Sequence, residues 1–299
     1  MEEKMYDQIR NDISKISVAT IKDLEGEIRD YLDKCGLFYK LFSRIKTVTS
    51  IIEKLESRKS KGIEDYKMQD LVGVRIVLYF KSDIQLCEKL IKQHFHVLNV
   101  SRDLDEPEKF RAQRINYVCQ LPEKVKNNFD EKVWEYPIDS TFEIQIRTIF
   151  SEGWHEIEHD FRYKCLEDWK DFDDLSRTLN GIFATLENCD WTISSLFSQV
   201  SYKHYKNAAW IPMLKNTFKI RILDCNGMDE ITEYFNQNKE VAKMFYRIDR
   251  EEFLLWLSDI KYRIPLNLKN LVYLVNIHQV KDEYIKSLTP ERLVKLIEC

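Results

Sequence analysis

The sequence predicts an α/β fold, or more loosely α+β, followed by a mainly helical C-terminal domain. Strand-like and helical patterns alternate between residues 38 and 147, whereas the segments after residue 210 have the spacing of helices. The chain has 299 residues, of which 44% are hydrophobic, so it can form a packed core in about two domains.

Apolar residues recur at helical spacing over 4–34 and predict one or two helices there. A short strand over 38–46 then leads to a helix for which Thr49 or Ser50 is the expected N-cap. Residues 71–80 form a β-branched run typical of a strand that is buried on both faces. Beyond it we expect a helix at 83–93, strands at 95–101, 115–121 and 141–147, and mainly helix over 148–200.

The polar stretch at 201–209 is the expected linker between two domains, one over 1–200 and one over 210–299. We expect the second domain to be helical and to have an accessory or regulatory role. Its apolar spacing predicts helices at 228–237, 239–246, 250–261, 267–277 and 290–298.

Composition excludes several classes of protein. The seven cysteines occur singly, without CxxC spacing, which favours reduced thiols and a cytoplasmic protein. No run approaches the ~20 apolar residues of a transmembrane helix, and the N-terminus lacks the apolar core of a signal peptide, so we expect no membrane partner. The net charge of -4 excludes a global basic field, so a site for a polyanion has to be a local cluster.

Two carboxylates occur in strand settings where a lone charge would be costly. Asp70 directly precedes the buried run, and Glu143 lies in a strand whose alternation puts Glu143, Gln145 and Arg147 on one polar face. A shared Mg²⁺ would compensate both carboxylates. The same α/β unit offers cations for the phosphates of a triphosphate, namely Arg44, Lys46, Lys54 and Arg75.

The competing interpretation of these residues is structural. Asp70 and Arg75 would form a buried ion pair, and Glu143 would be a half-exposed strand residue. The spacing alone does not separate the two interpretations.

Four segments, in one order, resemble the synthetase domain of the RelA/SpoT alarmone synthetases. They are RIKTVTSIIEK at 44–54, DLVGVRIVLYF at 70–80, FEIQIRT at 142–148 and WHEIEHDFRYK at 154–164. The likeness covers roughly residues 35–200. It implies a nucleotidyltransferase-like (polymerase β-like) mixed sheet flanked by helices. The implied reaction moves the β,γ-diphosphate of ATP to a ribose 3'-hydroxyl, commonly that of GDP or GTP.

The resemblance also implies roles for individual residues. Asp70 and Glu143 would hold Mg²⁺, and Glu143 would accept the proton of the attacking hydroxyl. The residues implied for ATP are Arg44, which would stack on adenine, and Lys46, Lys54 and Arg75. The residues implied for the acceptor are Gln145, Arg147 and Asn116.

The stretch 109–121 departs from the family pattern. Members that use guanine nucleotides usually carry Gly-Tyr here, followed by a histidine, whereas this chain has no Gly-Tyr and has Asn116 in place of the histidine. The acceptor is therefore left open between a guanine nucleotide, an adenosine nucleotide and the 3' end of tRNA, which is the acceptor of toxic relatives. Four cations near this stretch could bind an RNA backbone, namely Arg111, Arg114, Lys124 and Lys126. The alternative is that they are ordinary surface cations without a ligand.

Partners and alternatives follow from the same resemblance. A toxic synthetase would imply an antitoxin or a regulatory protein, and a homo-oligomer is also left open. A degenerate member would bind nucleotides or a partner without catalysis, but the intact Asp70 and Glu143 count against it.

The sequence HEIEH at 155–159 also fits the HExxH pattern of zinc metalloproteases. The charged Glu158 and the lack of a marked third ligand count against this alternative.

The pair His159 and Asp160 suggests a hydrolase of the HD type, but the further ligands of such a site are not evident, so we expect no alarmone hydrolysis.

Overall fold

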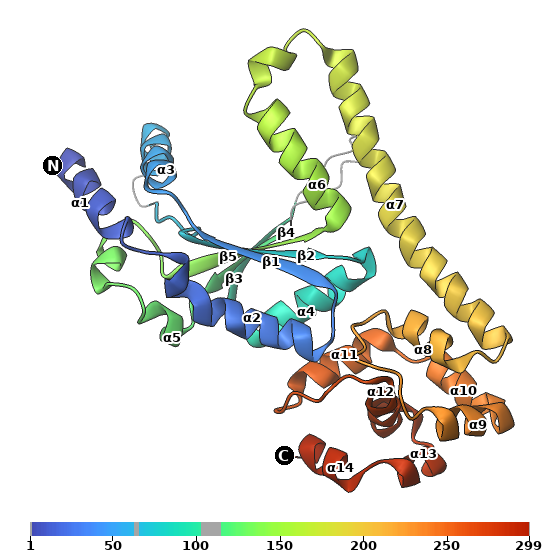
Figure 1. Ribbon diagram of the computed structural model, residues 1–299. Coiled ribbons are helices and arrows are strands. Elements are labelled where there is room, and N and C mark those ends of the chain that lie inside the picture. Colours follow the sequence, from blue (N-terminus) through green and yellow to red (C-terminus); the bar gives the residue numbers. More distant parts are fainter. Residues whose placement is uncertain (1, 63–65, 103–114, 299) are drawn as a thin grey trace. The chain divides into compact units, whose positions relative to one another are not determined.

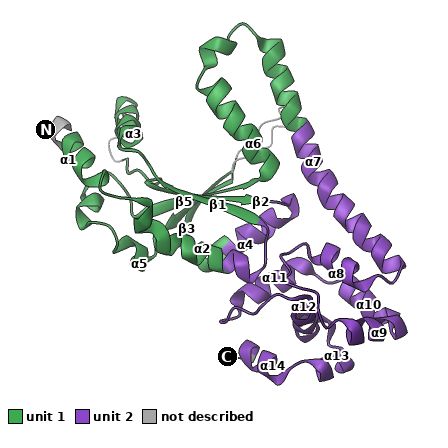
Figure 2. Ribbon diagram, viewed as in Figure 1, with its two compact units in different colours: residues 1–30, 39–78, 91–184 green, residues 31–38, 79–90, 185–299 purple. Residues whose placement is uncertain are grey.

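The computed structural model describes residues 2–62, 66–102 and 115–298 (Figure 1). The chain divides into two compact units (Figure 2). Unit 1 comprises Met1–Asp30, Tyr39–Leu78 and Ile91–Ala184, and unit 2 comprises Tyr31–Phe38, Tyr79–Leu90 and Thr185–Cys299. Arg111 and Arg114, considered above for RNA binding, lie outside the described residues.

Unit 1 contains a mixed sheet of five strands in the order β1-β2-β5-β4-β3. The central strands β2 and β5 are parallel, and the other neighbouring strands are antiparallel. This arrangement confirms the expected α/β fold with a mixed sheet. The strands are β1 (Tyr39–Ile45), β2 (Val72–Leu78), β3 (Val97–Arg102), β4 (Ile115–Gln120) and β5 (Thr141–Thr148).

The two faces of this sheet differ in chemistry. On one face Phe142, Ile144 and Ile146 of β5 are buried, and Phe95 packs against Phe142 with ring centroids 5.5 Å apart. The opposite face carries the polar residues of β5, as the alternation of 141–147 predicts. We call this the polar face, and it is where the chemistry-bearing side chains gather.

Helices flank the sheet. In Figure 1, α3 (Val48–Ser60) and α6 (Ile149–Glu158) rise from one side of the sheet, and α5 (Glu123–Lys126) lies on the other. The hydroxyl of Thr47 accepts the backbone N–H of Ser50 at 3.3 Å and caps α3, so the expected cap at Thr49 or Ser50 was wrong by two or three residues. The remaining helices up to residue 206 are α1 (Glu2–Ile13), α2 (Lys22–Lys34), α4 (Ile84–His94) and α7 (Asp173–Lys206).

The first helix after β5 starts without a loop. Thr148 ends β5, and its hydroxyl also accepts the backbone N–H of Ser151 at 3.2 Å, which caps α6. Because strand and helix share this residue, the side chains of the first turns of α6 are held close to the end of β5. A π-helix (His159–Tyr163) and a 3₁₀ helix (Leu166–Trp169) then connect α6 to α7.

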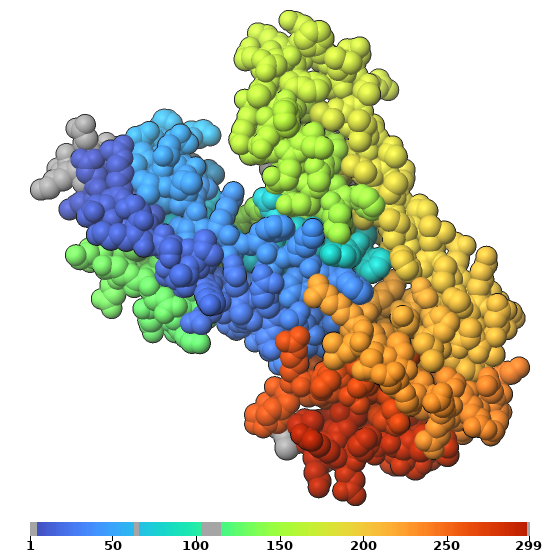
Figure 3. Space-filling model, viewed as in Figure 1, coloured from blue at the N-terminus to red at the C-terminus, as the bar shows by residue number. Residues whose placement is uncertain are grey.

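Unit 2 is helical after residue 184, as expected, and its orange and red residues form a continuous packed body in the space-filling view (Figure 3). Its core includes Phe218, Phe235, Phe245 and Phe253, all fully buried. The helices are α8 (Trp210–Phe218), α9 (Asp229–Gln237), α10 (Lys239–Tyr246), α11 (Arg250–Asp259), α12 (Leu268–Val275), α13 (Glu283–Leu288) and α14 (Glu291–Glu298).

The linker expected at 201–209 is mostly helix, because α7 continues to Lys206. Its polar character has a structural cause. The buried hydroxyl of Ser201 lies 3.1 Å from the carbonyl oxygen of Met213 and 2.7 Å from the hydroxyl of Thr217, both in α8. Ser201, in a stretch whose composition predicts a loop, therefore joins two packed helices.

None of the helices in the described part of the chain is long and apolar enough to cross a membrane.

Candidate active site

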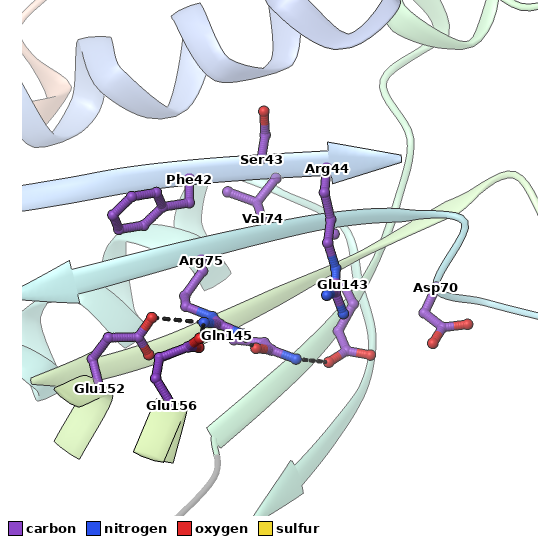
Figure 4. Close-up of a pocket in the computed structure, with 11 residues that line it drawn as sticks. Phe42, Ser43, Arg44, Asp70, Val74, Arg75, Glu143, Gln145, Glu152 and Glu156 are labelled. Atoms are coloured by element: carbon purple, nitrogen blue, oxygen red, sulfur yellow. Dashed lines mark hydrogen bonds and ion pairs between the residues drawn. The ribbon is translucent and has the colours of Figure 1, made fainter. Parts of the chain in front are cut away.

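A cavity of about 590 Å³ opens on the polar face of unit 1. In the close-up, Arg44 comes from β1, Arg75 from β2, and Glu143 and Gln145 from β5, and Asp70 stands just before β2 (Figure 4). Strand register explains why they meet: Arg44 lies opposite Gly73, Gly73 opposite Glu143, and Arg75 opposite Gln145. The lining residues are Phe42, Ser43, Arg44, Asp70, Gly73, Val74, Arg75, Glu143, Gln145, Glu152 and Glu156.

Asp70 holds two of the predicted ATP-binding cations. The Nζ atoms of Lys46 and Lys54 each lie 2.7 Å from its Oδ2 atom. Burial raises the pKa of the Asp70 carboxyl, but the hydrogen bonds and charges of the two lysines outweigh burial and hold that pKa below its usual range. The competing ion pair between Asp70 and Arg75 was wrong, because Arg75 pairs instead with carboxylates of α6.

The second oxygen of Asp70 is an unused acceptor. Its Oδ1 atom is buried and has no hydrogen-bond partner among the described residues. Glu143 has one engaged oxygen, since Gln145 Nε2 donates a hydrogen bond to its Oε1 atom at 2.8 Å. Each carboxylate thus retains an oxygen that the described protein groups do not use.

These two carboxylates fit a magnesium ion. Mg²⁺ is usually bound through one or two carboxylates together with phosphate oxygens and waters. The described residues contain no cluster of three or more His, Cys, Asp or Glu side chains suited to a metal, so these residues form no closed cage. The same finding leaves the HEIEH histidines without a third ligand among the residues described, which gives no support to a zinc site.

Arg44 is placed to receive an anion or a flat ring. It lines the cavity and forms no salt bridge with any residue that the structure describes. Gly73 leaves room beside it, since a Cβ atom at Gly73 would lie 3.5 Å from Arg44 Cγ, in ordinary contact. The other cations predicted for this region are already paired with carboxylates.

Two carboxylates that sequence reasoning missed complete the site. Glu152 and Glu156 of α6 each place an Oε1 atom 2.6 Å from Arg75 Nη1, and Glu152 Oε2 lies 2.9 Å from Arg147 Nη1. Their spacing of four residues on a helix put both on one helical face, which is the signal that could have identified them.

The residues predicted for the acceptor differ in position. Gln145 lines the cavity, and Asn116 lies opposite it in the register of β4 and β5, on the same face of the sheet. Arg147 is almost fully buried, with a side chain that is 4% exposed. Lys124 and Lys126 lie on α5, away from the cavity lining, and pair with Asp23 at 3.5 Å and Glu123 at 3.9 Å.

Comparisons with known proteins show what this region of the chain resembles. Residues 43–168 match the family model described as the region found in RelA / SpoT proteins. The chain is 32% identical over 132 residues to GTP pyrophosphokinase YwaC and 30% identical over 130 residues to GTP pyrophosphokinase YjbM, both from Bacillus subtilis. These matches cover 42% and 40% of this chain, and 59% and 54% of the two relatives, so it spans somewhat over half of their length.

Among solved structures, the small alarmone synthetase 2 from Bacillus subtilis is 22% identical, with a TM-score of 0.49 over 60% of this chain and 94% of the other. The match to the family model, residues 43–168, includes the end of β1, all of β2, β3, β4 and β5, and every residue that lines the cavity except Phe42. The region that carries the site is thus similar in sequence to RelA / SpoT proteins.

Proposed function

We propose that this protein is an ATP-dependent pyrophosphokinase that transfers the β,γ-diphosphate of ATP to a ribose 3'-hydroxyl. The observation that carries the proposal is the convergence of Asp70, Glu143 and Arg44 on one cavity, within a region of RelA/SpoT type. The cavity volume of about 590 Å³ lies in the range of small-molecule sites.

Asp70 and Glu143 would hold Mg²⁺, which would supply charge neutralisation at the phosphate oxygens when bound. A metal on Asp70 would compete with Lys46 and Lys54 for the same carboxylate. The two ammonium groups, 2.7 Å from Asp70 in this structure, would then be available to donate hydrogen bonds to phosphate oxygens. Arg44, which has no ion pair among the described residues, would stack on adenine.

Glu143 is the proposed general base. Its Oε1 atom is held by Gln145, which orients the carboxylate and leaves the other oxygen to accept the proton of the 3'-hydroxyl. A bond forms between the 3'-oxygen of the acceptor and the β-phosphorus, and the bond from the β-phosphorus to the α,β-bridging oxygen breaks. AMP leaves, and most of the rate enhancement comes from positioning and charge neutralisation.

The acceptor of the diphosphate is either a guanine nucleotide, an adenosine nucleotide or the 3' end of tRNA. The curated relatives are named GTP pyrophosphokinases, which supports a guanine nucleotide as acceptor, oriented by Gln145, Arg147 and Asn116. The altered stretch 109–121 is also compatible with an adenosine nucleotide or the 3' end of tRNA as acceptor. A tRNA acceptor would make the protein a toxin with an antitoxin or regulatory partner.

We also propose a division of labour along the chain. Residues 1–200 would contain the synthetase part, and the helices of 210–299 would act as an accessory or regulatory part of a cytoplasmic protein. Deletion of one part is a poor test, since α7 is continuous from Asp173 to Lys206. Oligomeric state, measured by light scattering with and without nucleotide, tests whether the chain associates with itself.

The experiment that tests the proposal uses γ-labelled ATP, Mg²⁺ and the acceptors GDP, GTP, ADP, AMP and deacylated tRNA. The wild type is expected to label one class of acceptor, and Glu143→Gln is expected to label none. Glu131→Gln, a matched change on an exposed residue of the 3₁₀ helix Glu131–Glu135, is the control and keeps wild-type activity. Binding of ATP by the wild type without transfer to any acceptor would instead support a degenerate member.

A further inference from the structure

Two carboxylates of α6 converge on one nitrogen of Arg75 at the wall of the cavity. Glu152 Oε1 and Glu156 Oε1 each lie 2.6 Å from Arg75 Nη1 (Figure 4). The two oxygens are close enough for their negative charges to repel each other. Two carboxylates therefore share one guanidinium nitrogen.

The two glutamates are not equivalent. Both oxygens of Glu152 are engaged, one by Arg75 and the other by Arg147, and its side chain is only 17% exposed. Glu156 contributes one oxygen to Arg75, and its side chain is 56% exposed. Glu152 is thus largely buried in the wall of the cavity, whereas Glu156 is largely exposed to solvent.

Arg75 does not need Glu156 to keep its position. Glu152 holds its Nη1 atom, and the side-chain oxygen of Gln145 accepts a hydrogen bond from its Nε atom at 3.2 Å. These two contacts fix the guanidinium at both of its ends. What Glu156 adds to the cavity is mainly a negative charge, next to a site proposed for a polyphosphate.

We propose that Glu156 sets the charge selectivity of this cavity, by weakening the binding of highly charged free nucleotides more than that of a magnesium-complexed nucleotide. This inference rests on the proposed function. A fixed negative charge opposes an anionic ligand in proportion to the charge of the ligand. Free ATP carries about twice the negative charge of its magnesium complex, so the carboxylate discriminates between the two.

The variant Glu156→Gln isolates this charge. It retains a side-chain oxygen that can accept a hydrogen bond from Arg75, and it removes the negative charge. We expect the affinity for free ATP to rise about three- to tenfold, and the affinities for magnesium-ATP and for AMP to rise about twofold or less. The gain for free ATP shrinks at high salt, because mobile ions screen a charge that is half-exposed.

Isothermal titration calorimetry on the full chain tests the inference, with ATP plus EDTA, ATP plus Mg²⁺, and AMP plus EDTA, each at low and high salt. Glu131→Gln removes the same charge outside the cavity lining and is expected to bind all three ligands as the wild type does. An unchanged or lower affinity for free ATP in Glu156→Gln, or an equal gain for all three ligands, overturns the inference. Absence of ATP binding by the wild type and both variants overturns the proposed function as well.

Discussion

Lys54 Nζ lies 2.7 Å from Asp70 Oδ2. A lysine proposed to bind ATP is therefore paired, in this structure, with a carboxylate proposed to bind magnesium. Lys46, which directly follows β1, makes the same contact. In this structure the two lysines neutralise Asp70, and if Asp70 held a metal they would be available to bind phosphate oxygens. The same residues would thus stabilise the fold in one state and bind substrate in the other.

Replacement of Asp70 by Asn is expected to change the pH dependence of stability. Burial raises the pKa of Asp70, but the opposite effect of Lys46 and Lys54 is larger. The folded-state pKa therefore lies below the usual value of 3.8. The carboxylate therefore stabilises the fold above that value, and this contribution is lost as the pH falls through the folded-state pKa. Urea unfolding should show Asp70→Asn less stable than the wild type at neutral pH, with a smaller difference below about pH 3.8. A constant difference at all pH values contradicts this, and the exposed Asp168→Asn serves as control.

Replacement of Lys54 by Met removes one of the two cations on Asp70. We expect the affinity for magnesium-ATP to fall about tenfold or more, because a charge-assisted hydrogen bond to phosphate is lost. Fluorescence titration with a labelled ATP analogue measures it. Lys61→Met, which removes an exposed charge just after α3, should bind the analogue normally. Equal affinities of the Lys54 variant and the wild type would exclude Lys54 from the ATP site.

The glutamates of α6 should differ in their effect on stability. Glu152→Gln removes the charge that pairs with the buried Arg147 at 2.9 Å and is expected to lower the free energy of unfolding by about 1–3 kcal/mol. Glu156→Gln, at a half-exposed position, should lower it by less than about 1 kcal/mol. Urea denaturation of the two variants under identical conditions compares them, and equal losses would contradict the distinction drawn between them.

The contact between α7 and α8 can be tested at Ser201. Ser201→Ala removes the hydrogen bonds to the Met213 carbonyl and the Thr217 hydroxyl in a buried setting, and should cost about 1–2 kcal/mol of stability. Ser198→Ala, at an exposed position one helical turn earlier, should have little effect. Thermal unfolding measures both. If Ser201→Ala were as stable as Ser198→Ala, residues 201–206 would act as the loosely packed linker that their composition suggests.

The sequence was sufficient to predict the polar face of the sheet. A strand has a side-chain period of two, so the alternation of 141–147 assigned Glu143 and Gln145 to one face without knowledge of the neighbours. The strand register then depends on tertiary structure, and it put Arg75 beside Gln145.

Other features depended on contacts that a sequence pattern does not contain. The spacing of Glu152 and Glu156 is visible in the sequence. Their contact with Arg75, however, depends on the direct junction of β5 and α6 at Thr148, which orients this face of α6. Likewise, the polar sequence around Ser201 predicts a loop, and only the α8 groups that bond its hydroxyl explain its place in a helix. Polar residues are the least predictable in position, because a distant partner can satisfy them.

The fate of each phosphate of ATP tests the central claim most directly. With wild-type protein, Mg²⁺ and the preferred acceptor, label in the β and γ positions should both move to the acceptor, and label in the α position should appear in AMP. Glu143→Gln should leave all three labels in ATP. Appearance of the α label in ADP, with only the γ label on the acceptor, would show transfer of a single phosphoryl group and would contradict the proposed reaction.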